Sequence, residues 1–340
     1  MSIAGIQARQ NRDTSRSPGE TPRAGAVSPA NPPVIVVEGL TKRYGNLTAV
    51  REVSFSVEQG EIFGLLGPNG AGKTTTLEII EGLRRADAGR VTVRGIDVAV
   101  EPRRARSVMG VQLQEAGFFE KLTVTETIAT FASFHRRSLP VRRLIERLQL
   151  QDKARTLVEN LSGGQRQRLS VALALVNDPD IVFLDEPTTG LDPQARRNLW
   201  DIIRSIREEG RTVVLTTHYM EEAEELCDRV AIMDHGEIIA LDTPARLVQT
   251  HAPGAKVFVT PGRDGMTGEM LSILSELPAA AGVDANGNGE LAVHTQDLET
   301  TVAALIDWGR SGRIQYKSLR VEVSNLEDVF LKLTGRRLRE

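Results

Sequence analysis

The sequence predicts an α/β fold organised around a parallel sheet, followed by a small α+β domain. Two short β-branched runs, residues 180–187 and 211–218, are bounded by turn residues and are typical of buried parallel strands. Residues 193–210 lie between them and form an amphipathic helix pattern, with Pro193 near its start and Gly210 past its end. This alternation of strand, helix and strand indicates a parallel sheet with helical crossovers.

Composition excludes several classes of protein. The chain has 340 residues, 40% of them apolar and 26% charged, with a formal net charge of −3, which argues against a broad nucleic-acid-binding surface. The single cysteine, Cys227, excludes an intramolecular disulfide and is expected to be a buried, inert thiol in a helix. No apolar run approaches the roughly 18 residues that span a bilayer, and no secretory signal is visible. We therefore expect the protein to act from a reducing aqueous compartment.

The N-terminal segment differs from the rest of the chain. Residues 1–33 are rich in Pro, Arg, Ser and Gly and have almost no aliphatic pattern. Such a segment cannot bury enough surface to offset its ordering entropy, so we expect a disordered tail. An Arg/Ser-rich transit peptide is the alternative, although no sustained amphipathic face supports it.

A first domain is expected at residues 34–249. Segments 34–44 and 50–67 are rich in β-formers, with apolar residues alternating at Val53, Phe55 and Val57. Further along we expect a helix after Gly72, strands at 89–95 and 107–114, helical stretches within 102–160, and a glycine-opened helix in 161–179 that ends before Pro179.

A second, smaller α+β domain is expected at residues 250–340. The pattern predicts strands at 255–262, 290–295 and 313–323, and helices at 268–277 and 298–312. A last helix is expected to begin with a capping box formed by Ser324 and Glu327 and to stop at Gly335.

A glycine-rich loop between a predicted strand and a predicted helix points to phosphate binding. Its residues, matching G-x-x-x-x-G-K-[ST], are Gly67, Pro68, Asn69, Gly70, Ala71, Gly72, Lys73 and Thr74. Glycines let the backbone curl so that amide N–H groups point into one concavity at the positive end of the next helix. Lys73 can reach the β- and γ-phosphates of a nucleotide, Thr74 can bind Mg²⁺, and Thr75 can touch the α-phosphate. A glycine-rich turn without a ligand is the alternative.

Two adjacent carboxylates follow an apolar strand further along the chain. Asp185 ends the run IVFLD and is suited to hold Mg²⁺ directly or through water. Glu186 follows it and is suited to orient or deprotonate a water that attacks the γ-phosphate. A solvated turn or a helix cap is the alternative for such a pair.

The segment LSGGQ at residues 161–165 resembles the signature sequence of the ATP-binding-cassette (ABC) family, and the other family motifs follow in order across residues 36–245. The resemblance implies a P-loop ABC ATPase fold, with a RecA-like parallel sheet, an antiparallel β subdomain and a helical signature subdomain. The motifs are the A-loop at Tyr44, Walker A at Gly67–Thr75, the Q-loop at Gln114, Walker B at Asp185 and Glu186, the D-loop at Asp192, and the switch histidine at His218.

The resemblance gives each of these residues an expected role. Gln114 would bind Mg²⁺ or the attacking water, with Gln112 nearby but at a less fitting spacing. His218 would contact the γ-phosphate and stabilise transition-state charge. Tyr44 would stack on adenine, although an ordinary core or surface tyrosine is the alternative. The signature residues open a helix and would form a second anion site for the γ-phosphate bound by another copy; they are Ser162, Gly163, Gly164 and Gln165.

One signature and one phosphate loop per chain imply a partner. The resemblance implies a head-to-tail homodimer that closes on two ATP and opens after hydrolysis. Ribosomal and chromosomal ATPases use the same kind of ATP-binding cassette. The ribosomal type has two cassettes per chain, and the chromosomal type has a long coiled coil. Transport is therefore favoured, with ATP hydrolysis energising a permease on a separate polypeptide and the subunit peripheral to the cytoplasmic face of the membrane.

The C-terminal part narrows the resemblance. Residues 219–247 and 326–335 are similar to the daunorubicin-resistance type of ATP-binding subunit, which pairs with ABC-2 type permeases. This implies an exporter of drugs or antibiotics, with export of a lipid or polysaccharide as the alternative and a soluble, non-transport ATPase as a remote one. A coupling surface for the permease is expected between Gln114 and Leu122, where Phe118 and Phe119 either form a hydrophobic socket or pack within the cassette.

Overall fold

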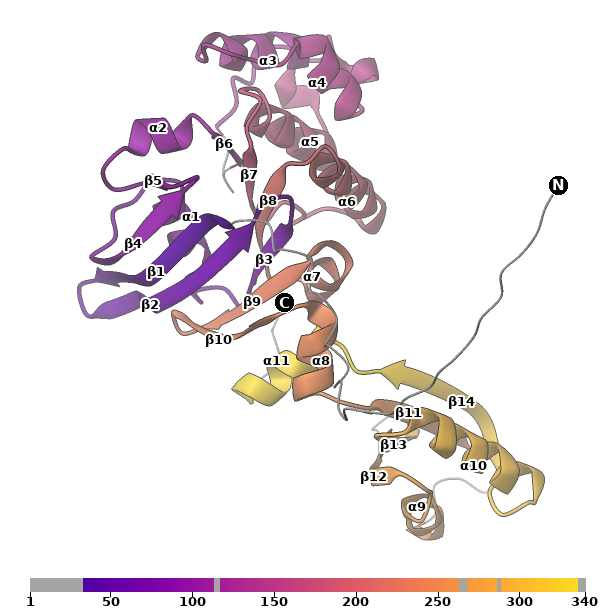
Figure 1. Cartoon of the computed structure of the whole chain (residues 1–340). Helices are drawn as coiled ribbons and strands as arrows, with labels where there is room; N and C mark the ends of the chain where they lie inside the picture. Colours follow the sequence, from indigo (N-terminus) through magenta and orange to yellow (C-terminus); the bar gives the residue numbers. More distant parts are fainter. Residues whose placement is uncertain (1–32, 113–116, 263–267, 286–288, 336–340) are drawn as a thin grey trace, which may run out of the picture. The chain divides into compact units, whose positions relative to one another are not determined.

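The computed structural model describes residues 33–112, 117–262, 268–285 and 289–335 (Figure 1). The predicted N-terminal tail, apart from Pro33, and the predicted Q-loop residue Gln114 lie outside the described residues. Among the residues described, no helix is long and apolar enough to cross a membrane.

A six-stranded sheet forms the centre of the cassette, in the order β10-β9-β3-β8-β7-β6. Strands β9, β3, β8, β7 and β6 are parallel, and β10 pairs antiparallel with β9, so the predicted parallel sheet is confirmed. The strands are β3 (Ile62–Leu66), β6 (Met109–Gln112), β7 (Ile181–Asp185), β8 (Thr212–Thr217), β9 (Arg229–Asp234) and β10 (Glu237–Asp242).

Both faces of this sheet are buried, because alternate residues of its strands belong to two different cores. In β7, Phe183 packs into one core and Leu184 into the other. A sheet that is covered on both sides requires continuous apolar runs, which is why β3 and β7 read as IFGLL and IVFLD.

One core lies against a four-stranded sheet in the order β2-β1-β4-β5. Its strands are β1 (Pro33–Tyr44), β2 (Leu47–Glu58), β4 (Ala88–Val93) and β5 (Ile96–Asp97), and all neighbours pair antiparallel. Phe55 of β2 stacks on Phe63 of β3, with ring centroids 5.1 Å apart, and so joins the two sheets. The expected antiparallel subdomain is confirmed, with helices α1 (Lys73–Ile80) and α2 (Pro102–Arg106) beside it.

Helices cover the second core. The helical region expected at 102–160 contains α3 (Val124–Ser133) and α4 (Val141–Arg147), which pack against the signature helix α5 (Gly163–Ala174). Helix α6 (Pro193–Glu208) follows β7 and turns its apolar side inward through Leu199, Ile203 and Ile206. Helices α7 (Met220–Leu226) and α8 (Pro244–His251) complete this layer.

The small C-terminal sheet has the order β12-β13-β11-β14, with all neighbours antiparallel. Its elements are β11 (Ala255–Pro261), α9 (Gly268–Ser275), β12 (Ala280–Ala285), β13 (Leu291–Thr295), α10 (Leu298–Arg310) and β14 (Tyr316–Val323). The chain order βαββαβ and this strand order define the split-βαβ, ferredoxin-like arrangement. The predicted α+β character is confirmed, and β12 is an additional strand that the sequence did not predict.

The last described helix, α11 (Leu326–Thr334), corrects one prediction. Its N-cap is Asn325, which forms a capping box with Asp328, so the box lies one residue beyond the predicted Ser324 and Glu327. Gly335 ends the helix in a left-handed conformation with φ 70°, as predicted.

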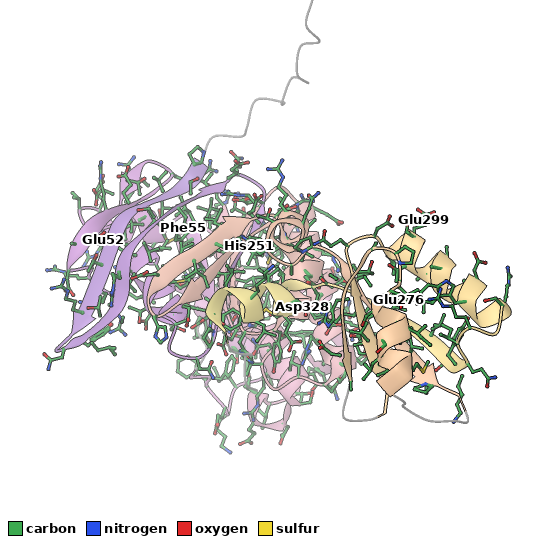
Figure 2. The ribbon with its side chains drawn as sticks, turned by 90° about the horizontal axis from the view of Figure 1, so that it is seen from below. Glu52, Phe55, His251, Glu276, Glu299 and Asp328 are labelled. Atoms are coloured by element: carbon green, nitrogen blue, oxygen red, sulfur yellow. The ribbon has the colours of Figure 1, made fainter. Side chains whose placement is uncertain are left out.

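Helix α11 does not belong to the core of the small sheet. Leu326, Val329 and Phe330 pack in the same core as α5 and α6, and the helix contacts α7 and α8. Figure 2 shows Asp328 on this helix and His251 at the end of α8. The chain therefore leaves the cassette after α8, builds the small sheet, and returns to the cassette at α11.

Cys227 is buried, as predicted, but it follows α7 rather than lying within it. Burial raises the pKa of its thiol well above the ordinary value, so the thiol stays protonated and unreactive.

Candidate functional site

The glycine-rich loop connects β3 to α1 and is shaped by backbone approaches that only glycine permits. A Cβ on Gly67 would lie 2.3 Å from the Met233 carbonyl oxygen, and one on Gly72 would lie 2.3 Å from that of Ala49. Gly70 and Gly72 also have positive φ values of 82° and 100°. Within the loop, Ala71 N–H donates to Pro68 O at 3.1 Å, and Asn69 is exposed. Helix α1 begins at Lys73 directly after this turn.

Lys73 points its ammonium group back into the loop. Its Nζ donates to Gly67 O at 2.8 Å and to Pro68 O at 3.1 Å, and it lies 3.5 Å from Glu186 Oε1. The side chain is only 4% exposed. Burial lowers the pKa of Lys73, while the Glu186 charge opposes that shift. A buried ammonium held mainly by neutral carbonyls is suited to exchange these partners for phosphate oxygens.

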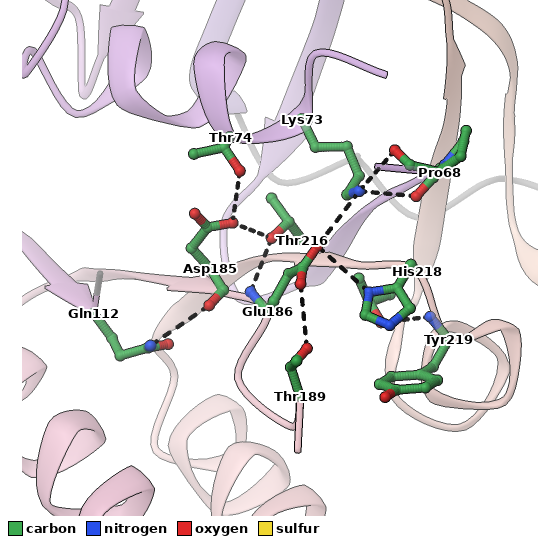
Figure 3. Close-up of polar contacts among 12 residues, drawn as sticks. Pro68, Lys73, Thr74, Gln112, Asp185, Glu186, Thr189, Thr216, His218 and Tyr219 are labelled. Carbon is green, nitrogen blue, oxygen red and sulfur yellow. Dashed lines mark hydrogen bonds and ion pairs between the residues drawn. The ribbon is translucent and has the colours of Figure 1, made fainter. Parts of the chain in front are cut away.

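Asp185 lies at the end of β7 and gathers hydroxyl groups from two other elements (Figure 3). Its Oδ1 accepts hydrogen bonds from Thr74 Oγ1 at 3.3 Å and from Thr216 Oγ1 of β8. Burial raises the pKa of Asp185, and the two hydroxyl hydrogen bonds lower it. Thr216 Oγ1 also accepts from the Glu186 amide N–H at 2.9 Å, so one threonine fixes both acidic residues.

Glu186 lies between a cation and a histidine. Its Oε1 is 3.5 Å from Lys73 Nζ and 3.4 Å from His218 Nδ1, and its Oε2 accepts a hydrogen bond from Thr189 Oγ1 at 3.2 Å. The contact with His218, aided by the Lys73 charge, lowers the pKa of Glu186 to about 2 despite burial. Its backbone φ of 46° is rare for a residue with a side chain and marks a constrained position.

These residues meet because three neighbouring parallel strands end at one edge of the sheet. Leu66 pairs with Thr217, and Asp185 pairs with Thr216. The segments that follow β3, β8 and β7 therefore lie together, although they are far apart in the sequence. Ligands of open α/β sheets bind at this carboxyl-end edge.

Of the two glutamines at positions 112 and 114, the structure describes only Gln112. The side chain of Gln112 is buried, and its Nε2 donates to Asp185 O at 3.5 Å. Gln114 lies outside the described residues, so its expected role at the metal and the water stays a prediction.

Tyr44 ends β1 and is 39% exposed. Lys42 Nζ and Arg84 Cζ lie 5.5 and 5.4 Å from the ring centroid. Tyr44 is therefore not a core residue, and its expected stacking on adenine remains a prediction.

The signature residues and the predicted D-loop line a common hollow of about 200 Å³ between α5 and α6. Ser162 caps α5 in a capping box with Gln165, whose Oε1 accepts from Ser162 N at 3.0 Å. Asp192 caps α6 by accepting from Ala195 N at 2.8 Å. The lining includes Ser162, Gly163, Gly164, Gln165, Gly190, Asp192 and Ala195.

Several residues of the site escaped the sequence analysis, among them Thr189, Thr216 and Glu81. Thr216 is one of several threonines near a strand end, and only the pairing of β8 with β7 reveals that it faces Asp185. Glu81 follows α1 and is 1% exposed. Burial, followed by the charges of Asp185 and Glu78, raises the pKa of Glu81 to about 8. A lone glutamate after a helix gives no signal of such burial.

The donor set near Asp185 suits Mg²⁺. Thr74 and Asp185 offer hydroxyl and carboxylate oxygens 3.3 Å apart, and hard oxygen ligands are those that Mg²⁺ prefers. Within the described ranges no cluster of three His, Cys, Asp or Glu side chains could hold a metal ion.

Comparison with known proteins reveals clear similarities. A model of the ABC transporter family matches residues 50–189. The Nod factor export ATP-binding protein I of Ralstonia nicotianae is 42% identical over 317 residues, covering 91% of this chain and 96% of that protein. The protein of the same name from Mesorhizobium japonicum is 40% identical, covering 89% and 87%.

Solved structures are similar over the cassette. The ATP-binding cassette MJ0796 in a dimeric, post-hydrolysis state with ADP and Pi is 26% identical and covers 62% of this chain and 98% of its own, with a TM-score of 0.56. A structure of the ATP-binding subunit of an ABC transporter is 27% identical, with the same TM-score and coverages of 64% and 92%.

Proposed function

The chain belongs to the ABC transporter family, and we propose that it hydrolyses MgATP to drive export through a membrane permease on a separate polypeptide. Its P-loop ATPase fold and the similarity of nearly the whole chain to export ATP-binding proteins establish an ATP-binding subunit of the exporter kind.

One observation carries the proposed hydrolytic centre: Glu186 lies within 3.5 Å of both Lys73 and His218 at the edge where three strands end. A phosphate cation, a carboxylate and an imidazole at one point are the groups that γ-phosphate hydrolysis needs. In this role Lys73 binds the β- and γ-phosphates, Glu186 orients the attacking water and receives its proton, and His218 stabilises charge on the γ-phosphate.

The low pKa of Glu186 has a mechanistic consequence. With a pKa of about 2 the carboxylate is ionised but is a poor proton acceptor. Phosphate oxygens would draw Lys73 away from Glu186, because they carry more charge than a single carboxylate. Loss of that cation would raise the pKa of Glu186 only in part, because the contact with His218 is the larger cause of the low value and stays in place.

Thr74 and Asp185 would hold Mg²⁺, and Gln114 is proposed as a further ligand. When bound, the ion neutralises charge on the β- and γ-phosphates. Thr216 maintains the direction of the Asp185 carboxylate from the neighbouring strand.

A second copy completes the site. We propose that the signature residues at the start of α5 contact the γ-phosphate held by the loop of the other copy, because the helix N-terminus presents free N–H groups there. The similar cassette MJ0796 is described as dimeric in its post-hydrolysis state, which supports a homodimer here.

The direction and cargo rest on relatives. Proteins named for Nod factor export support export from the cytoplasmic face of the membrane. The daunorubicin-resistance resemblance supports an ABC-2 type permease with a drug or antibiotic as cargo, and a lipid or polysaccharide is the alternative. The names of these relatives give Nod factor as the exported molecule. The cargo of this chain is therefore to be determined by a transport measurement.

A surface strip of aromatic rings is the proposed coupling site. Phe118 packs against the helical core, whereas Phe119 is 50% exposed. The Phe119 ring lies 6.2 Å from that of Phe131, which lies 5.9 Å from Phe134, itself 67% exposed. Exposed aromatic clusters of this kind mark interaction sites. We therefore assign Phe119 and Phe134, rather than Phe118, to the permease contact.

The decisive experiment reconstitutes the chain with an ABC-2 type permease from the same genome. Inside-out vesicles should take up cargo only with ATP and Mg²⁺, and the complex with Glu186→Gln should bind ATP without transport. ATP hydrolysis that proceeds without any cargo movement for drugs, lipids and polysaccharides would overturn the exporter proposal.

A further inference from the structure

Strand β14 leaves one edge of the small sheet open. It is the outermost strand of the order β12-β13-β11-β14, and among the residues that the structure describes it pairs only with β11 (Figure 1). Most of its side chains are exposed, and Val321 and Val323 are 42% and 65% exposed. Neither of the two cassette cores nor the core of the small sheet contains these two valines. The strand thus combines an open edge with exposed apolar side chains.

The backbone of β14 is oriented for pairing. Ser324 N–H, directly after the strand, donates to Gly254 O on the β11 side at 3.4 Å. Main-chain groups alternate in direction along a strand, so Leu319, Val321 and Val323 direct their N–H and C=O groups to the open edge. Proteins usually protect such an edge with proline, lysine or a bulge. The segment YKSLRVEV has no proline, and its only lysine, Lys317, lies at a register irregularity near its start, away from residues 319–323.

We propose that β14 pairs antiparallel with β14 of a second copy about a two-fold axis through Val321. This register places Val321 opposite Val321 of the second copy and Leu319 opposite its Val323. The three apolar residues lie on one side of the sheet because they are two residues apart. Leu319 already packs against the small core, so the pairing extends that core across the axis.

Charge supports this register. Arg320 and Glu322 alternate with the apolar residues and lie on the opposite side of the sheet. With Val321 on the axis, each Arg320 lies opposite Glu322 of the second copy, in the non-hydrogen-bonded positions where side chains approach most closely. Within one chain Arg320 contacts Glu322, lies 3.4 Å from Glu290 Oε2 and places its Cζ 4.1 Å from the Phe258 ring centroid, so it would turn from β11 towards the edge to meet the second copy. One register therefore matches both the apolar and the charged residues.

This contact differs from the proposed nucleotide interface. It involves no residue of the glycine-rich loop or of the signature, and it requires no ATP. Its failure and the failure of the proposed ATPase mechanism are therefore separable, since all measurements below use the nucleotide-free full-length chain.

Cysteine cross-linking tests the axis. In Val321→Cys two introduced thiols would face each other in a hydrogen-bonded pair with Cα atoms about 5.5 Å apart, within disulfide range. Val323→Cys is the matched control, because it is more exposed but lies about 13 Å from its own equivalent in this register. The native Cys227 is buried and common to both variants. Mild oxidation should cross-link Val321→Cys at least about tenfold faster than Val323→Cys.

Exchange of the charges at positions 320 and 322 provides a second test. Contacts within one chain cannot produce its result, because the restoring pairs form only between two different chains. Arg320→Glu and Glu322→Arg should each weaken dimerisation at least about tenfold in sedimentation experiments, because each places like charges opposite each other. Mixing the two variants should restore dimers, since acidic positions then face basic ones only between different chains. Equal cross-linking of the two cysteine variants, or a mixture that dimerises no better than either charge variant, would overturn the proposal.

Discussion

The ammonium of Lys73 and the carboxylate of Glu186 lie 3.5 Å apart, with side chains that are only 4% and 8% exposed. One residue starts the helix after the glycine-rich loop, and the other follows β7. This pair links the proposed phosphate-binding and hydrolytic residues. Substitution of Lys73 and substitution of Glu186 should have different consequences, because Lys73 is proposed to bind the nucleotide and Glu186 to take part in hydrolysis.

Glu186→Gln should lower steady-state ATP turnover at least about a hundredfold while changing nucleotide affinity by less than about threefold. The amide keeps the shape but can accept no proton, so ATP-bound dimers should accumulate. Turnover can be followed by phosphate release and dimers by light scattering. Thr189→Val removes only the hydroxyl that donates to Glu186 Oε2 and should retain most of the activity. A Glu186→Gln variant that turns over near the wild-type rate contradicts the assignment.

Lys73→Ala should weaken ATP binding at least about tenfold, because a buried phosphate cation is lost. Calorimetry of the purified protein measures the change. Lys121→Ala is a suitable control, since Lys121 is 81% exposed and pairs with Glu159 on the surface. An unchanged affinity in Lys73→Ala would refute the role of the loop.

Thr216→Val should reduce ATP turnover about tenfold or more, although the shape of the residue is preserved. The substitution removes the hydroxyl that donates to Asp185 and accepts from the Glu186 amide. Thr212→Val at the opposite end of the same strand is the matched control, and it should affect stability rather than turnover. Equal turnover in both variants would show that Thr216 has no positioning role.

Stability should depend on pH through Glu81. Its ordinary pKa of 4.5 is raised to about 8 in the folded protein, chiefly by burial. Between these values the folded state keeps a proton that the unfolded state has lost, so stability is full below about pH 4.5 and falls as pH rises towards 8. The loss is at most about 1.4 kcal/mol per pH unit.

Glu81→Gln carries no ionisable proton and should show a smaller drop in melting temperature between pH 6 and pH 8 than the wild type. The exposed substitution Glu299→Gln provides the control and should behave like the wild type. Parallel melting curves for wild type and Glu81→Gln would contradict the raised pKa.

Phe119→Ala and Phe134→Ala should leave the basal ATPase rate of the isolated chain nearly unchanged but reduce its stimulation by the permease. Both rings are at least half exposed, so folding should tolerate their removal. Phe118→Ala, in contrast, should lower the melting temperature, because Phe118 packs against the helical core. Full stimulation of the two exposed variants would move the coupling surface elsewhere.

The sequence predicted the features that follow from local chemistry. Three such features were predicted correctly: the glycine pattern of residues 67–72, the apolar runs that end at Leu66 and Asp185, and the burial of Cys227. Short β-branched apolar runs bounded by turn residues are typical of strands buried on both faces. Glycine is required at 67 and 72 because a Cβ there would lie 2.3 Å from another carbonyl oxygen.

The rest depends on how distant segments meet. The position of Thr216 opposite Asp185 follows from the strand order β3-β8-β7, which the order of segments in the chain does not reveal. Strand β12 consists of AAGVDA, whose alanines and glycine are poor strand formers, and pairing with β13 overrides that preference. The cap of α11 falls on Asn325 rather than Ser324, where Leu326 can enter the cassette core and its N–H can reach Glu224.

Because α11 returns to the helical core, the small sheet is an insertion within the cassette and not an appendage at its end. A truncation at the start of this insertion would also remove α11. Leu326, Val329 and Phe330 would then be lost from the core that they share with α5 and α6, so truncation alone cannot delete the small sheet cleanly. Exchange of modules between homologous subunits should instead splice at both junctions, near residues 252 and 325, and leave the terminal helix with its original cassette.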